Sequence, residues 1–493
     1  MWVYHEDSLS TIEHLRCGCN AQSVPAQVND SASASASTSV STELHKELSQ
    51  IAPISSQDCD EFKNVFLSSN KNALASRALI RDSYSTVLEN RDVKLSLPAV
   101  FNNVLKLEGN ITNQKSSGRC WIFAGLNVLR LKVMQKYNLE TFELSQTYLF
   151  FYDKIERANY FLQNIISTIT LDLDSREVQH LLTSPVEDGG QWDMFVNLVN
   201  KYGVVPISVY PDSFHSTSSG QMNALLTTKL RTFARDIRKS FENDANVSKL
   251  HDIRKSALTE IYRILAISLG IPPSSFDWKF YDKDKKYLEF KDLTPTSFFS
   301  THVDTPILQT TSLINDPRNP YYMPYTVKHL GNVIGGKPIR YINVPAQKLK
   351  DLASSTISSK SKPVWFGCHV SKHINKSATI LDLDIIDYKS GFDINFGLNK
   401  AERLEYGDSL MTHAMVFTGV QIDNNKTSSW RVENSWGEDS GSKGFITMSD
   451  DWFSEYVYQV VLDHSDIPQE ILNILNRDPI ELPPWDPMGA LAK

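Results

Sequence analysis

The sequence predicts an α+β protein in which a helical half precedes a sheet-rich half. Apolar residues recur at helical spacing in the first half, most clearly from Cys120 to Tyr137. Short runs rich in β-branched and aromatic residues, separated by turn residues, begin near residue 338. The chain has 493 residues, of which 41% are hydrophobic, so it is long enough for two or more packed units.

Composition and local pattern divide the chain into five segments. Residues 1–60 should form a disordered or flexible extension, because the Ser/Ala-rich run at 28–43 cannot bury a core. Closely spaced prolines near the C-terminus predict an extended arm there. The four further segments are a helical lobe at 61–215, a helical insertion at 216–325, a β-rich lobe at 326–480 and the C-terminal arm at 481–493.

Helical periodicity is strongest in the first lobe. The helix that begins at Cys120 is apolar on most sides, which is typical of a buried helix. The pattern is also helical from Leu44 to about Glu89. Further helices are expected at 143–166, 176–183 and 191–202, with one more near 468–476 before the arm.

The insertion should contain two amphipathic helices between residues 222 and 269, ended by Gly270 and the prolines that follow. Their apolar faces exceed what two helices can bury against each other, which favours a role in oligomerisation. The first helix also carries a basic run, which could face a polyanion if several copies gathered around a channel. The run consists of Lys229, Arg231, Arg235, Arg238 and Lys239, opposed by Asp236.

Charge and hydropathy exclude several classes of protein. A net charge of −7 argues against a protein dominated by nucleic-acid contacts. The first residues include acidic side chains and no apolar signal segment, and no run approaches the ~18 apolar residues of a membrane helix. We therefore expect a cytoplasmic protein with no membrane partner.

The five cysteines are too few and too scattered for a disulfide framework. Cys17 and Cys19 form a C-x-C pair, but no second pair of ligands accompanies them, so we expect no metal site and no cofactor. Cys368 and His369 stand together on an apparent strand. Neighbours in a strand point to opposite faces, so these two should not work as a pair.

Cys120 is the candidate nucleophile. It stands at the start of the buried helix, after the loop "NQKSSGR". A helix N-terminus and a partner imidazolium both favour the thiolate, which is the reactive form of cysteine. Gln114 lies on the preceding loop. Its side-chain amide and the backbone N–H of Cys120 could point two donors at one spot, as a tetrahedral oxyanion requires.

His413 is the candidate base. It begins a β-type run, "HAMVFTGV", and Asn434 follows later in "RVENSWG". An amide oxygen such as that of Asn434 can hold an imidazole in one tautomer and one orientation. Trp436 could cover that hydrogen bond and keep competing water away from it.

These motifs together resemble those of papain-like cysteine peptidases, in the same order along the chain. Gln114, Gly118, Cys120 and Trp121 match one motif, and the motifs around His413 and Asn434 match the other two. The separation of Cys120 from His413 far exceeds the ~130–150 residues of papain, which leaves room for the helical insertion. The insertion, "EDGGQWDMF" and the terminal "WDPMGALA" resemble the bleomycin hydrolase family over most of the chain from about residue 60.

The resemblance implies a two-lobed papain-like core and a cytosolic aminopeptidase that acts on peptides. It also implies a homohexameric ring whose active sites face an internal channel, with each C-terminal arm in its own cleft. Trimming of Lys493 would end that arm at Ala492. The implied roles are nucleophile for Cys120, general acid/base for His413, orienting residue for Asn434, oxyanion donor for Gln114, and substrate binding for Gly189, Gly190, Trp436 and Ala492.

Two other functions fit parts of the sequence. A transglutaminase or another acyltransferase could use the same Cys-His pair, although transglutaminases have Asp as the third residue and this chain has Asn434. A protein that binds nucleic acid through the basic run is the alternative without catalysis, and its affinity would fall steeply with salt.

Overall fold

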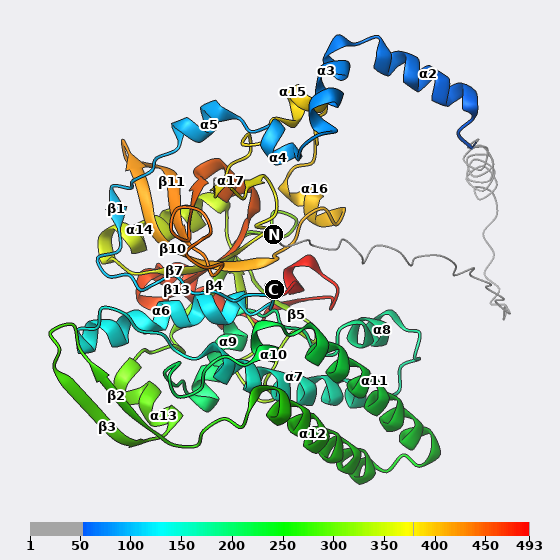
Figure 1. Ribbon diagram of the computed structural model, residues 1–493. Helices are drawn as coiled ribbons and strands as arrows, with labels where there is room; N and C mark the ends of the chain where they lie inside the picture. Colours follow the sequence, from blue (N-terminus) through cyan, green and yellow to red (C-terminus); the bar gives the residue numbers. More distant parts are fainter. Residues whose placement is uncertain (1–52, 378, 493) are drawn as a thin grey trace. The chain divides into compact units, whose positions relative to one another are not determined.

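The structure is a computed structural model that describes residues 53–377 and 379–492 (Figure 1). The chain divides into two compact units, one ending at Ala73 and one beginning at Leu74. In the first unit, α2 (Ser56–Leu67) begins with a capping box between Ser55 and Asp58. The predicted extension at 1–60 is therefore helical from Ser56 onward. Its remainder up to residue 52, including Cys17 and Cys19, lies outside the described residues.

The four helices that the sequence predicts between residues 120 and 202 are present within a few residues of the predicted positions. They are α6 (Cys120–Tyr137), α7 (Gln146–Ser167), α8 (Arg176–Thr183) and α9 (Trp192–Tyr202). As predicted, α6 is buried on most sides, from Cys120 to Met134. Its C-terminus lies at Asn138, whose left-handed backbone (φ 51°) ends the helix. No helix in the described part of the chain is long and apolar enough to span a bilayer.

The two predicted helices of the insertion are α11 (Gly220–Asn243) and α12 (Val247–Leu269). Each buries one apolar stripe at helical spacing, for example Leu226, Leu230 and Ile237 on α11. Both helices pack against α7 of the same chain (Figure 1). Most of the apolar surface that the sequence assigned to oligomerisation is therefore covered within the chain, while Leu225, Val247 and Ile267 are exposed. Oligomerisation through these helices stays a prediction.

The rest of the predicted helical insertion contains strands. β2 (Phe276–Tyr281) and β3 (Tyr287–Leu293) form a hairpin, which packs its aromatic side chains around Tyr137 at the end of α6. β4 (Thr310–Ile314) and β5 (Pro324–Val327) already belong to the main sheet. The prediction that 216–325 is helical was therefore wrong after Leu269. β4 and β5 were missed because they are short and pair with strands far along the chain, β13 and β14. The β2–β3 hairpin is local, and its alternating pattern could have been found from the sequence.

Among the described residues, the main sheet has the strand order β14-β5-β6-β4-β13-β7-β10-β11-β12-β9-β8, and β1 pairs with β10. The remaining strands are β1 (Asn103–Val104), β6 (Tyr341–Asn343), β7 (Val364–Cys368), β8 (Ile374–Asn375), β9 (Ile380–Leu381), β10 (His413–Asp423), β11 (Lys426–Glu433), β12 (Phe445–Ser449), β13 (Val457–Asp463) and β14 (Ile480–Leu482).

The other helices are mostly short. They are α3 (Asn70–Leu79), α4 (Tyr84–Val87), α5 (Arg91–Ser96), α10 (Phe214–Thr217), α13 (Pro295–Phe298), α14 (Ala346–Lys360), α15 (Tyr388–Phe392), α16 (Lys400–Glu405), α17 (Asp450–Tyr456) and α18 (Gln469–Leu472). The predicted helix near 468–476 is α18 followed by a 3₁₀ turn at Asn473–Asn476. The sequence reading missed α14, which interrupts the β-rich lobe.

The central strands of the sheet have one core on each face. Along β7, Trp365 joins the core that contains α6, whereas Phe366 and Cys368 join the core that contains α14 and α17. Strand β10 lies beside β7 and packs against α6. The start of β10 is thereby brought to the start of α6, although the two are far apart in sequence.

A buried ion pair connects the two lobes. The Nη2 atom of Arg130, on α6, lies 2.8 Å from Oε1 of Glu433, at the end of β11. Their side chains are 1% and 5% exposed, and burial raises the pKa of Glu433. Glu433 directly precedes Asn434, so this ion pair also fixes the segment that carries the amide predicted to orient His413.

We expect Glu433→Leu to lower the free energy of unfolding by about 3–5 kcal/mol, because it leaves Arg130 charged and unpaired in the core. The double variant Arg130→Met/Glu433→Leu should recover most of that loss, since it removes both charges and keeps apolar volume. Urea unfolding of both variants measures the difference. Equal destabilisation of the two would show that the charge pair is not what holds this region.

Candidate active site

Cys120 is the first residue of α6 and is completely buried. The loop before it is attached to the β-rich lobe. The backbone N–H of Gln114 donates to the carbonyl of Ser435 at 2.9 Å, and Asn113 pairs with Trp436. The residues around Cys120 and those around Asn434 therefore form one continuous structure.

His413 and Asn434 are directly hydrogen-bonded. Nε2 of His413 lies 2.9 Å from Oδ1 of Asn434, and both side chains are buried. The backbone N–H of Ser435 donates to the same Oδ1 at 2.8 Å, so this atom of Asn434 is the acceptor oxygen. Nε2 of His413 must then carry the proton, which leaves Nδ1 as the basic nitrogen of the neutral ring. The ring of Trp436 lies 5.2 Å from the imidazole, at the position expected of a cover.

The thiol of Cys120 contacts the backbone beside this histidine. The backbone of Ala414, the residue after His413, hydrogen-bonds to the Cys120 sulfur, as does the backbone of Trp121. Burial nevertheless raises the pKa of Cys120 to about 12 and lowers the pKa of His413 to about 4. Burial thus opposes the thiolate in the free site, against the helix N-terminus and the imidazolium that are expected from the sequence to favour it. Proton transfer from sulfur to imidazole creates both charges together as a pair.

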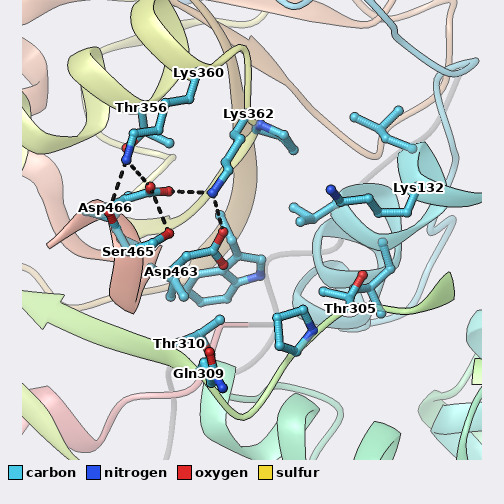
Figure 2. A pocket seen from close by; sticks show the side chains of 18 of the residues that line it. Lys132, Thr305, Gln309, Thr310, Thr356, Lys360, Lys362, Asp463, Ser465 and Asp466 are labelled. Carbon is cyan, nitrogen blue, oxygen red and sulfur yellow. Dashed lines mark hydrogen bonds and ion pairs between the residues drawn. The ribbon is translucent and has the colours of Figure 1, made fainter. Parts of the chain in front are cut away.

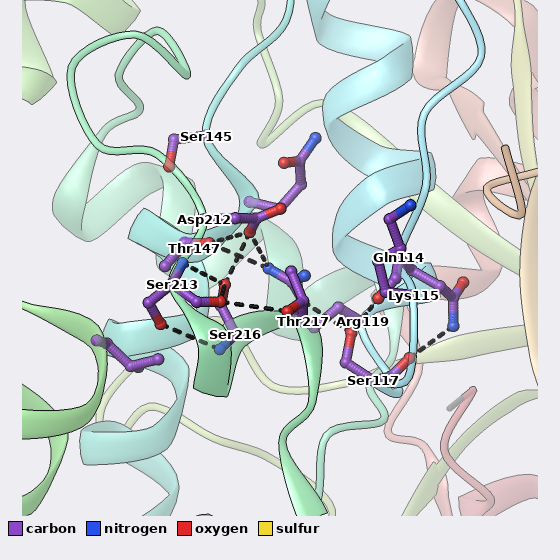
Figure 3. Close-up of polar contacts among 12 residues, drawn as sticks. Gln114, Lys115, Ser117, Arg119, Ser145, Thr147, Asp212, Ser213, Ser216 and Thr217 are labelled. Atoms are coloured by element: carbon purple, nitrogen blue, oxygen red, sulfur yellow. Dashed lines mark hydrogen bonds and ion pairs between the residues drawn. The ribbon is translucent and has the colours of Figure 1, made fainter.

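Gln114 is buried, and it precedes Cys120 on the same loop. Its side-chain amide is hydrogen-bonded within that loop. Its Nε2 donates to the carbonyl of Ser117 at 2.7 Å, and the Ser117 hydroxyl donates back to the carbonyl of Gln114 (Figure 3). This bond uses one amide hydrogen and leaves the second for an oxyanion. Within the described residues, no hydrogen bond joins Gln114 to Cys120 or His413.

Asp188 is a central residue of the site that the sequence reading missed. Its Oδ2 accepts from the backbone N–H of Gly118 at 3.0 Å, and its carbonyl accepts from Nε1 of Trp121 at 2.7 Å. It therefore contacts residues on both sides of Cys120. The quoted stretch "EDGGQWDMF" places a carboxylate beside the glycine pair, and this was the only signal in the sequence.

The charge of Asp188 is balanced by a buried lysine. Nζ of Lys154, on α7, lies 2.6 Å from Oδ1, and Asn223 and Ser219 also donate to the carboxylate. Burial works to raise the pKa of Asp188, but the charge of Lys154 and these hydrogen bonds outweigh it, so the pKa lies well below its usual range. The carboxylate remains ionised and can hold the cysteine loop at neutral pH.

Arg119 secures the same loop from the other side. Its fully buried guanidinium donates to Asp212 at 3.0 Å, to Thr147 at 3.1 Å and to the Ser117 hydroxyl at 2.9 Å (Figure 3). These partners belong to three separate segments. Arg119 and Asp188 thus hold the residues just before Cys120 by ionic contacts to the helical lobe, which a search for catalytic residue types does not detect.

The glycine pair meets the C-terminal arm. The N–H of Gly190 donates to the carbonyl of Ala492 at 2.9 Å, and the N–H of Ala492 donates to the carbonyl of Gly190 at 3.2 Å, as in an antiparallel sheet. The carbonyl of Gly189 accepts from Arg157 instead. A Cβ atom on Gly190 would lie 2.4 Å from the ring of Trp121, so only glycine fits there. The buried Ala492 thus occupies the edge predicted to bind substrate.

Two cavities flank this region without including Cys120, His413 or Asn434. One cavity, of about 650 Å³, is lined by the middle of α6 and by the segments that follow α14 and β13. In its wall, Lys360 and Lys362 form ion pairs with Asp466 (Figure 2). The other, of about 540 Å³, lies along the arm. Neither cavity contains the predicted catalytic residues, so the cavity sizes alone would have misplaced the site.

The two-lobed fold, with a cysteine at a helix start beside an amide-bound histidine, defines a papain-like cysteine peptidase. Residues 53–489 match the model of the Peptidase C1-like family. The chain belongs to this family, as the resemblance predicted.

Individual relatives specify which kind of cysteine peptidase this is. The chain is 47% identical to chicken (Gallus gallus) bleomycin hydrolase over 80% of its own length and 89% of that protein. It is 45% identical to human (Homo sapiens) bleomycin hydrolase, with the same shares covered, and 42% identical to aminopeptidase C of Listeria monocytogenes over 84% and 93%. The crystal structure of PepW from Lactobacillus rhamnosis superimposes with a TM-score of 0.87 at 42% identity, covering 90% of this chain and all of that one. The protein is a hydrolase, a cysteine-type aminopeptidase of the bleomycin hydrolase type, and the transglutaminase alternative is set aside.

We expect Gln114→Ala to lower kcat by about 10²–10³ with a smaller change in KM, because an oxyanion donor acts only in the transition state. Lys115→Ala, at the exposed neighbouring position, is the matched control and should keep normal kinetics. Steady-state kinetics on an amino acid amide provides the measurement. An unchanged kcat for Gln114→Ala would place the oxyanion site elsewhere.

We expect Gly190→Ala to lower stability by about 1–3 kcal/mol, because the new Cβ overlaps the fully buried Trp121. It should also reduce kcat/KM, since Trp121 follows the nucleophile. Gly220→Ala is the control: nothing lies within 4 Å of a Cβ there. Thermal unfolding should give a lower Tm for Gly190→Ala than for Gly220→Ala. Equal Tm values would contradict the close packing of Gly190 against Trp121.

Proposed function

We propose that the protein removes N-terminal residues from peptides, and hydrolyses related amides, through a Cys120 thioacyl intermediate. The pairing of Ala492 with Gly190 carries this proposal. A substrate chain that extended across the glycine pair would need the same backbone groups. With the arm there, only a short N-terminal part of the substrate can lie on that side of the scissile bond.

Each catalytic residue has one task in this mechanism. The Cys120 sulfur attacks the scissile carbonyl carbon as its proton passes to Nδ1 of His413, and the Gln114 amide with the Cys120 N–H stabilises the oxyanion. His413 then gives that proton to the leaving amine, and the C–N bond breaks to leave a thioester on Cys120. Water attacks the thioester with His413 as base, which releases the amino acid and restores the thiol.

Asn434 and the buried surroundings serve the proton transfer. The hydrogen bond from Nε2 of His413 to Asn434 keeps Nδ1 directed at the sulfur and stabilises the imidazolium when it forms. Because burial disfavours either charge alone, the thiolate and the imidazolium arise as a pair when the substrate is in place. Trp436 keeps water from the His413–Asn434 bond.

The selection of a free amine is assigned to the end of the arm. After removal of Lys493, the new carboxylate at Ala492 would face the α-amino group of the substrate. Such a partly desolvated charge pair is worth about 2–5 kcal/mol, or roughly 30- to 4,000-fold in specificity. Lys493 itself lies outside the described residues.

One further part of the proposal rests on the names of the relatives, and two more rest on the family resemblance alone. Some of the relatives are named bleomycin hydrolase, and we propose that amides like the one hydrolysed in bleomycin are among the substrates of this protein. We also propose a homohexamer and a cytoplasmic location. Nucleic-acid binding stays a prediction; its basic run is mostly engaged within the chain, with Lys229 bonded to Glu260 and Arg231 and Arg238 donating to backbone carbonyls.

The test compares a free-amine peptide amide with its N-acetylated form. Wild type should cleave the first and not the second, and Cys120→Ala should cleave neither. Deletion of Asp486–Lys493 should lower aminopeptidase activity and permit cleavage of the N-acetylated peptide, because the non-primed side is then open. If the deleted form still demands a free amine, the selection comes from another acidic residue in the cleft.

A further inference from the structure

The arm has two backbone attachments and one ionic contact between them. At its start, β14 pairs in parallel with β5, and at its end Ala492 pairs with Gly190. Between the two attachments, Oδ1 of Asp486 lies 2.9 Å from Nη2 of Arg318. The two side chains are only 10% and 14% exposed, so solvent screens this contact weakly.

Arg318 is held rigidly before it meets the arm. Its Nε and Nη2 donate to the two oxygens of Asp316, at 2.9 and 2.8 Å, in a bidentate arrangement. Asp316 is itself fully buried, and its backbone N–H donates to Oδ1 of Asn343 on β6 at 2.9 Å. Arg318 therefore donates the second N–H of Nη2 to Asp486 from a fixed position on the sheet.

Asp486 also shapes the arm. The oxygen that contacts Arg318 accepts the backbone N–H of Met488 at 2.8 Å, which caps the 3₁₀ turn at Pro487–Gly489. This turn directs the last residues toward Gly190. The ion pair and the turn share one carboxylate oxygen, so the position of the turn is tied to Arg318.

Side-chain contacts also hold the arm: the Arg176 guanidinium lies 4.0 Å from the ring centre of Trp485, and the side chains of Met488 and Ala492 are buried. The backbone contacts of the arm end specify its register poorly. Residues 489–492 are small or aliphatic, and the backbone pairing with Gly190 would form again with the arm moved along by two residues, about 6.6 Å, which keeps the same side chains facing inward. Gln191 donates to the carbonyl of Ala490 and Tyr341 to that of Met488, but every residue offers such a carbonyl. Asp486 is the only carboxylate between β14 and Ala492.

Packing does not fix the arm fully either. The cavity of about 540 Å³ beside it is lined on one side by Pro484–Pro487 and 489–491, and on the other by residues of α7 and α8. The arm thus borders open space, into which it could shift without a collision.

We infer that Arg318 and Asp486 form a clamp that sets the register of the arm, and so determines how many substrate residues fit before the scissile bond. Both are positioning residues, since neither belongs to the Cys120 machinery. The inference rests on the proposed aminopeptidase function. A released arm would move its end relative to Gly190, weaken the contact with the substrate amine, and admit a longer or blocked N-terminus.

Two substitutions of Asp486 distinguish the effect of its charge from the effect of its cap on the 3₁₀ turn. Asp486→Asn keeps an oxygen that can cap Met488 but removes the charge, whereas Asp486→Ala removes both. Glu481→Gln is the control, because it removes a charge from an exposed position of the same arm. For each variant we would measure kcat and KM on an amino acid amide, kcat/KM on N-acetylated peptides, and product masses from an unblocked peptide.

We expect both Asp486 variants to raise KM for the free-amine amide, leave kcat within about threefold, and lose at least tenfold in selectivity for a free amine over an N-acetyl group. Dipeptides should appear among their products, and Glu481→Gln should match wild type. Wild-type selectivity in both variants would overturn the clamp, as would loss in Asp486→Ala alone, which would assign the effect to the turn cap. Wild type unable to cleave any free-amine amide would instead contradict the proposed function itself.

Discussion

The packing of α6 against β10 is the contact on which the site depends. It brings Cys120, at the start of the helix, beside His413, at the start of the strand, and it buries both side chains. Burial disfavours an isolated thiolate and an isolated imidazolium, which favours their formation as a pair. The surroundings of Cys120 therefore depend on the junction between the lobes as well as on the helix N-terminus.

Buried ions hold this junction in place. Asp188 with Lys154, and Arg119 with Asp212, attach the cysteine loop to the helical lobe, whereas Arg130 and Glu433 connect the lobes. Buried ion pairs add little net stability compared with apolar residues, but breaking one partner is costly. Their role here is geometric, because they hold the backbone on both sides of Cys120 in place.

The C-terminal arm occupies the backbone edge at Gly190, which in the proposed function limits the length of substrate before the scissile bond. Its end pairs with Gly190 as a substrate strand would, and its middle is held by Arg318 through Asp486. In the proposed function, specificity comes from occupation of the Gly190 edge by the chain itself, and so it depends on how firmly the arm is positioned. The catalytic residues do not need to differ from those of an open cleft.

The sequence by itself determined the residue types of the site and most helices of the first lobe, since Cys120, Gln114, His413 and Asn434 lie in motifs and the helices carry a clear local period. It did not reveal β4 and β5 within the expected insertion, nor the packing of α7 against α11 and α12, because those contacts join segments distant in the chain. Asp188, Arg119 and Arg318 were missed for the same reason: an ion is defined by its partner, and their partners lie elsewhere in the sequence. Only the tertiary structure decided these pairings, the burial that shifts the pKa values of Cys120 and His413, and the register of the arm.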